Sequence, residues 1–157
     1  MEKSTSRILT SHVGSLIRPP ELLEHLKAKR EGRMDEKAHA ATLARCVKDI
    51  VARQREFGVD IPSDGEFGKD ISWSQYALER MSGFERRPVK PGQATPFARG
   101  ADRTRFAEFY AELDAKDVPA TQHDSVCVGP IRYTGHAALQ HDIDNFKAAL
   151  SAAGLKE

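Results

Sequence analysis

The chain has 157 residues, of which 39% are hydrophobic and 30% charged, with 24 lysines and arginines against 23 aspartates and glutamates. This length suits one domain with a hydrophobic core. The formal net charge of +1 gives no reason to expect nucleic acid or a membrane surface as a partner. No apolar run approaches the roughly 20 residues of a membrane span, so we expect a cytoplasmic protein.

The first third of the chain predicts a strand and two helices. Residues 7–13 form a short segment with β-branched side chains that leads directly into a Gly-Ser turn, and this pattern predicts a strand. Two prolines begin a helix that runs to Lys29, because proline suits the first helical turn. A longer helix begins near Asp35, a suitable N-cap, and ends at Gly58. Its apolar face carries, at helical spacing, Leu43, Val47, Ile50 and Gln54.

A second strand and helix follow. Residues 59–61 predict a brief strand, which Pro62 and the polar turn at Asp64 end. Residues 71–81 carry apolar side chains at helical spacing. Strand, helix, strand and helix in this order indicate βα units and a parallel sheet.

The second half of the chain begins with an excursion over residues 85–105, which is rich in proline, glycine and arginine. We interpret it as an insertion, a solvated loop whose alternative role is contact with an acidic partner. Residues 106–113 predict an amphipathic helix, residues 126–131 a strand, and residues 139–150 a last helix that Gly154 ends.

The first candidate site lies over residues 12–19, at the end of the first predicted strand, where α/β enzymes place their active residues. Gly14 allows a close backbone approach. The amide and hydroxyl of Ser15 could hold a carboxylate, with Arg18 near enough to add charge. The alternative is a strand-to-helix turn with a capping serine, and such turns are common.

The second candidate site is Ser63-Asp64-Gly65-Glu66, which closes the second predicted strand. Two acids that flank a glycine could bind an amino group or a metal, or act as acid and base. The alternative is a polar turn before a helix, with Glu66 offsetting the helix dipole.

Together these motifs are specific. A strand ending in His-Val-Gly-Ser-Leu-Ile-Arg-Pro, followed by Gly-Val-Asp-Ile-Pro-Ser-Asp-Gly-Glu, resembles the C-terminal catalytic barrel of cobalamin-independent methionine synthases, above all the shorter bacterial proteins built from that barrel alone. A third matching segment covers residues 128–135, so the resemblance runs from about residue 8 to residue 150. It implies an α/β fold, with residues 1–157 forming the N-terminal part of a (β/α)8 TIM barrel.

The resemblance also implies roles for single residues. Gly14 and Ser15 would bind the carboxylate of homocysteine, and Glu66 would hold its amino group. Asp64, His12 and Arg18 join them by position beside these residues. The chemistry agrees, because an amino acid needs an amide and hydroxyl nest at one end and an acid at the other.

Enzymes of this family transfer a methyl group from methyltetrahydrofolate to the homocysteine sulfur, which zinc activates as a thiolate. Their zinc ligands, a His-x-Cys pair, a glutamate and a further cysteine, match nothing in this sequence. We expect Cys46 and Cys127 to be buried structural thiols. A complete barrel takes about 250 residues. We therefore expect a truncated chain that carries part of the thiol site and lacks methyltransferase activity by itself.

Two alternatives stay open. The first is a zinc-dependent alkyl transferase that acts on another thiol such as coenzyme M; since that thiol carries a sulfonate and no amino group, Glu66 favours an amino-acid thiol. The second is a non-enzymatic half barrel, which a separate chain or a second copy would complete, because a partial barrel exposes an open parallel edge.

Overall fold

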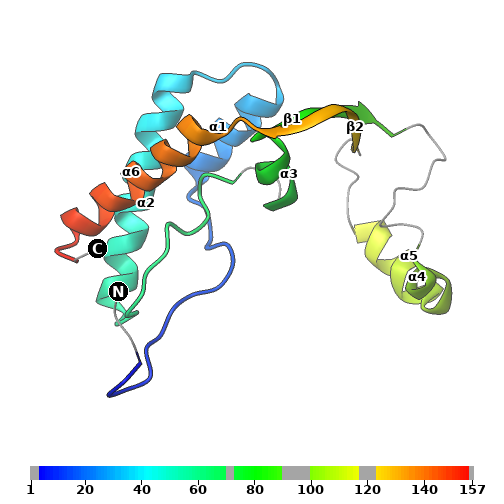
Figure 1. The fold of residues 1–157 in the computed structure, drawn as a ribbon. Helices are drawn as coiled ribbons and strands as arrows, with labels where there is room; N and C mark the ends of the chain where they lie inside the picture. The colour runs from blue at the N-terminus through cyan, green and yellow to red at the C-terminus, as the bar shows by residue number, and fades with distance from the viewer. Residues whose placement is uncertain (1–3, 70–72, 90–99, 117–122, 156–157) are drawn as a thin grey trace. The chain divides into compact units, whose positions relative to one another are not determined.

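The computed structural model describes residues 4–69, 73–89, 100–116 and 123–155, and its helices and strands are shown in Figure 1. In chain order they are α1 (Pro20–Arg30), α2 (Glu36–Glu56), α3 (Trp73–Leu78), β1 (Met81–Pro88), α4 (Ala101–Arg105), α5 (Ala107–Lys116), β2 (His123–Tyr133) and α6 (His136–Ala152). The chain divides into two compact units, one of residues 1–80 with 135–157 and one of residues 81–134. Within the described ranges no helix is long and apolar enough to cross a membrane.

The core of the first unit lies between α1, α2 and α6, with α2 packed against both other helices (Figure 1). Helix α2 begins as predicted, because the side chain of Asp35 accepts a hydrogen bond of 3.0 Å from the amide of Ala38. It ends beside Gly58, which has a φ of 78°. The buried residues of this core are Leu22, Leu43, Cys46, Val47, Val51, Phe67, Ala149 and Ala153.

The predicted portion of a TIM barrel is wrong. Strands β1 and β2 pair antiparallel in a two-stranded sheet. In the part of the chain that the structure describes, the two segments predicted as parallel strands share an isolated bridge between Ser11 and Ile61. The alternative of a non-enzymatic half barrel assumed the same fold, so the structure does not support it either.

The physical reason is that the described residues leave much of these segments uncovered. Parallel strands are stable when helices bury both of their faces, whereas Ile8 and Val13 are 87% and 92% exposed. With one neighbour each, the two segments do not extend their pairing into a ladder. Asp60 holds them together instead, accepting hydrogen bonds of 2.8 Å from the amide of Thr10 and from Nη1 of Arg7. These contacts hold the pKa of the Asp60 carboxyl well below its usual range.

The second unit contains the antiparallel pair and the helices α4 and α5. The predicted strand at residues 126–131 is confirmed within β2. Met81, predicted at the end of a helix, begins β1 instead, after α3 has ended at Leu78. Strand β1 also takes up the start of the predicted insertion. Residues 90–99 of that insertion lie outside the described ranges, as do residues 71–72 of the predicted helix.

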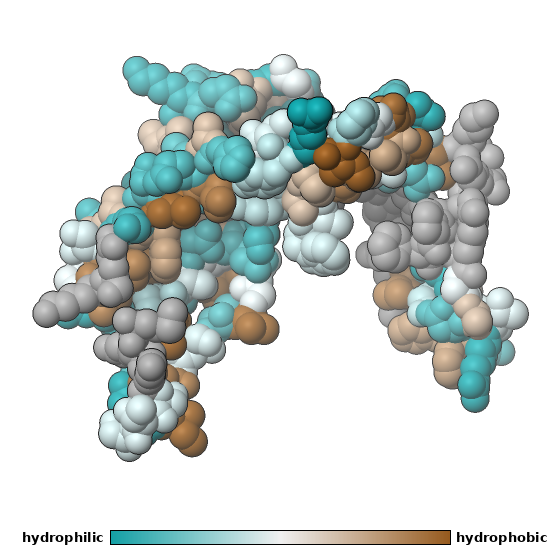
Figure 2. Space-filling model, in the orientation of Figure 1, coloured by the Kyte–Doolittle hydropathy of each residue, from teal (hydrophilic) through white to brown (hydrophobic). Residues whose placement is uncertain are grey.

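Most residues of the two-stranded ribbon are exposed. Cys127, expected to be buried, is therefore exposed, whereas Cys46 is buried as predicted. Phe106 and Phe109, on the predicted amphipathic helix, are also more than half exposed. Figure 2 shows apolar side chains at the surface of both units.

Candidate functional site

The two motifs singled out in the sequence lie in direct contact. The hydroxyl of Ser15 donates a hydrogen bond of 2.9 Å to Oε2 of Glu66. Next to it, the amide of Leu16 donates to the carbonyl of Gly65 at 3.0 Å. These two bonds help to join two loops of the first unit.

The second loop holds Glu66 in a conformation that side chains rarely adopt. Gly65 and Glu66 have φ values of 70° and 58°, both in the left-handed region, which costs a non-glycine residue about 1–2 kcal/mol. The carboxylate of Asp64 offsets this cost by accepting a 2.9 Å hydrogen bond from the amide of Glu66. Asp64 is therefore a residue that positions Glu66.

The side chain of Gln54 on α2 is hydrogen-bonded to the same loop. Its side chain is 5% exposed. Its Nε2 donates to the carbonyl of Ser63 at 2.7 Å, while its Oε1 accepts from the amide of Ser63 at 3.0 Å. In the sequence, Gln54 lies among apolar residues at helical spacing, and no functional role was predicted for it. A polar residue at a buried helical position was the signal for this contact, because buried polar groups are almost always hydrogen-bonded.

A lysine that was not among the predicted site residues completes the cluster. Nζ of Lys69 lies 2.7 Å from Oε1 of Glu66, and the two side chains are 26% and 29% exposed. The Lys69 ammonium, followed by the Ser15 hydroxyl, lowers the pKa of the Glu66 carboxyl. The carboxylate is therefore charged and reachable from solvent. We call this cluster, formed by Ser15, Arg18, Glu66 and Lys69, the junction site.

Of the other predicted residues, the structure brings Arg18 into the junction site. Arg18 donates from Nη2 to the carbonyls of Glu66 and Lys69, at 3.0 and 2.7 Å, so it braces the loop. Gly14 has a φ of 89°, and no described atom lies within 4 Å of the point where a Cβ would stand. His12 is exposed. The roles of these three residues in ligand binding stay predictions.

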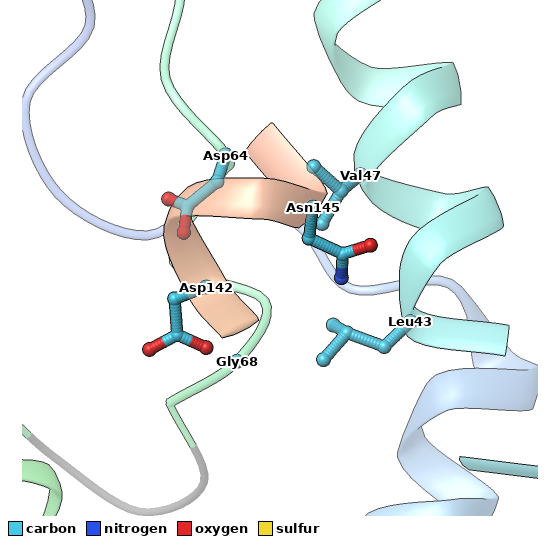
Figure 3. Close-up of a pocket in the computed structure, with 6 residues that line it drawn as sticks. All are labelled: Leu43, Val47, Asp64, Gly68, Asp142 and Asn145. Atoms are coloured by element: carbon cyan, nitrogen blue, oxygen red, sulfur yellow. The ribbon is translucent and has the colours of Figure 1, made fainter. Parts of the chain in front are cut away.

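A small pocket lies next to the loop that carries Glu66. Figure 3 shows how three elements line it, with apolar side chains of α2 facing polar side chains of α6 and of the loop. The lining residues are Leu43, Val47, Asp64, Gly68, Asp142 and Asn145. Asp64 thus belongs to both the pocket and the turn.

Asp142, on α6, ties α3 to this region. Its Oδ2 accepts hydrogen bonds from the Tyr76 hydroxyl at 2.6 Å and from Nη2 of Arg80 at 2.8 Å. The guanidinium of Arg80 also lies over the Tyr76 ring, 3.4 Å from its centroid. Burial and the hydrogen bond to Asp142 together raise the pKa of Tyr76 to about 12.

The described residues do not fit the zinc that the family resemblance implies. In that part of the chain no group of three or more histidine, cysteine, aspartate or glutamate side chains stands ready for a metal. Cys46 is buried and donates to Glu21, and burial raises the pKa of its thiol. Cys127 is exposed in the second unit.

Removing the Asp64 carboxylate tests the turn. We expect Asp64→Ala to lower the free energy of unfolding by about 1–2 kcal/mol, because the amide of Glu66 loses its acceptor. Asp64→Asn keeps an oxygen at the same place and should cost less than half as much. Urea unfolding followed by circular dichroism measures both. Equal losses in the two variants would contradict a hydrogen-bonding role.

No family model matches the chain. Over 110 residues, or 69% of its length, the chain is 32% identical to an uncharacterised protein of Bacillus subtilis, YxjH, and covers 28% of it. Over 76 residues, or 48% of its length, it is 32% identical to a methionine synthase of Sulfolobus acidocaldarius, and covers 22% of that enzyme. The chain thus spans about a quarter of the length of these relatives, and part of it is similar to a methionine synthase.

Proposed function

We propose that the junction site binds an amino-acid thiol of the homocysteine class, as part of methyl transfer to the thiol sulfur. The observation that carries the proposal is the charged, partly exposed carboxylate of Glu66, fixed beside Ser15 in a left-handed turn. The similarity of 76 residues to a methionine synthase supports the same reaction class.

Each residue would have a defined task. Glu66 accepts hydrogen bonds from the ligand ammonium, which are short and strong when both groups are charged. The Ser15 hydroxyl orients Oε2 of Glu66. The open backbone at Gly14 lets the ligand carboxylate approach the neighbouring amides. The proposed reaction moves a methyl group from methyltetrahydrofolate to sulfur, so a C–S bond replaces the folate C–N bond and the thiol proton passes to that nitrogen.

Isothermal titration calorimetry with L-homocysteine under reducing conditions tests the binding step. We expect Glu66→Gln, which keeps the shape and removes the charge, to weaken binding about 10- to 100-fold, since a hydrogen bond to a charged group contributes about 1.5–3 kcal/mol. Ser15→Ala should weaken it only several-fold, because Ser15 acts through Glu66.

Coenzyme M serves as the matched ligand, because it is a thiol with an anionic group and no ammonium. We expect the chain to bind homocysteine more tightly than coenzyme M. A preference for coenzyme M would favour the alkyl transferase alternative. Homocysteine binding that is unchanged in Glu66→Gln would contradict the proposal.

A further inference from the structure

The junction site already contains an ammonium group where the proposed ligand would place its own. Nζ of Lys69 stands 2.7 Å from Oε1 of Glu66. This is the distance typical of a charge-assisted hydrogen bond between an ammonium and a carboxylate. Ser15 occupies the other oxygen of Glu66 at 2.9 Å. Both carboxylate oxygens are therefore engaged before any ligand arrives.

We propose that Lys69 is a specificity-determining residue, an internal ammonium that the amino group of the ligand must displace from Oε1 of Glu66. This inference rests on the proposed function of the junction site. In the ligand-free chain Lys69 neutralises Glu66. When an amino-acid ligand binds, its ammonium takes the place of Nζ.

The surroundings of Lys69 keep the free-energy cost of this exchange small. Its side chain is 26% exposed, so the released ammonium returns to water without becoming a buried charge. The Tyr76 ring, whose centroid is 5.8 Å from Nζ, offers the ammonium a second favourable neighbour. The exchange needs no new backbone arrangement, because Nη2 of Arg18 holds the carbonyl of Lys69 at 2.7 Å.

Competition between Lys69 and the ligand ammonium for Glu66 should lower the affinity of the chain for homocysteine. A partly exposed ion pair contributes little to stability, about 0.2–1 kcal/mol. Removing the Lys69 ammonium should therefore tighten homocysteine binding about two- to fivefold. It should at the same time weaken binding of coenzyme M, because the unpaired Glu66 carboxylate would repel the sulfonate.

The test compares Lys69→Met with Lys69→Arg by calorimetry on the full chain. Methionine keeps the length of the side chain without the charge, and arginine keeps the charge. We expect the methionine variant to bind homocysteine more tightly and the arginine variant to bind it like the original chain. Lys48→Met, which removes a charge from an exposed position on α2, should leave the affinity unchanged.

A measurement without ligand tests whether Lys69 and Glu66 form an ion pair in solution. In a ¹³C titration of the glutamate carboxyls, Lys69→Met should raise the pKa of Glu66 from its lowered value toward the usual one. An unchanged pKa would show that the pair does not form in solution and would overturn the inference.

The outcomes separate the two proposals. If Glu66→Gln leaves homocysteine binding unchanged, the proposed function fails. If Glu66→Gln weakens binding but Lys69→Met weakens it too or leaves it unchanged, only the role of Lys69 is overturned, because Lys69 then supports the ligand or stands apart from it. In the Glu66→Gln background, Lys69→Met should have no further effect on homocysteine affinity.

Discussion

Replacing Phe67 by alanine is expected to lower the free energy of unfolding by about 3–5 kcal/mol. Phe67 is 1% exposed and belongs to the core of the first unit. It directly follows Glu66 in the chain, so its ring holds the loop that carries Glu66 against the core. The ring also sits close to Gly65, where an added Cβ would stand 2.9 Å from Cε1. Loss of the ring would leave a cavity beneath the junction site.

The same substitution should loosen the junction site. With the ring gone, the left-handed turn at Gly65 and Glu66 loses its packing partner, and homocysteine affinity should fall together with stability. Phe67→Leu fills most of the volume and should cost about 1–2 kcal/mol. Urea unfolding at fixed protein concentration measures the stabilities of all three chains. A loss below about 1 kcal/mol in Phe67→Ala would show that the loop is not anchored by this ring.

The helices of the first unit could be predicted because their signals are local. The N-cap at Asp35 and the glycine at position 58 lie within a few residues of the helix ends that they define. Helices α1 and α6 likewise cover the predicted ranges of residues 20–29 and 139–150. An amphipathic period of 3.6 residues is a property of a short window of sequence, and the fold preserves it.

The sheet could not be predicted because strand pairing is not local. Residues 7–13 satisfy the composition of a strand, but a strand needs a neighbour and a cover, and Val13 has neither burial nor a ladder. Strand β1 was not predicted, because its composition is not that of a strand. Its sequence, Met-Ser-Gly-Phe-Glu-Arg-Arg-Pro, has the composition of a loop, yet β2 pairs with it.

The candidate site divides in the same way. Ser15 and Glu66 were singled out from their motifs, and they are in hydrogen-bond contact; their role in binding a ligand stays a prediction. Lys69 and Gln54 were missed, because a lysine in a loop and a glutamine in a helix look ordinary in sequence. Their meaning lies in partners that the fold brings to them, Glu66 and Ser63.

Replacing Asp142 by alanine should have the second-largest effect, a loss of about 2–3 kcal/mol in the free energy of unfolding. The change removes the acceptor of the Tyr76 hydroxyl and of Nη2 of Arg80, while Nη1 of Arg80 keeps its hydrogen bond to the carbonyl of Tyr76. The Arg80 side chain is only 13% exposed, and a largely buried cation that loses its counter-charge is destabilising. Asp142→Asn keeps an oxygen acceptor and should cost less, which separates the hydrogen bond from the charge.

The titration of Tyr76 gives an independent measurement of the same contact. Its pKa is raised to about 12, so the phenol stays neutral in the folded chain at a pH where an unfolded tyrosine ionises. The stability that this shift represents is present below pH 10, the usual pKa of tyrosine. It is lost as the pH rises toward about 12. Because burial and Asp142 both raise the pKa, Asp142→Ala should lower it only part of the way. A spectrophotometric titration should show this shift, with Tyr76→Phe to assign the signal. An unchanged pKa of Tyr76 in Asp142→Ala would mean that burial alone keeps the phenol neutral. Asp142 would then not tie α3 to α6.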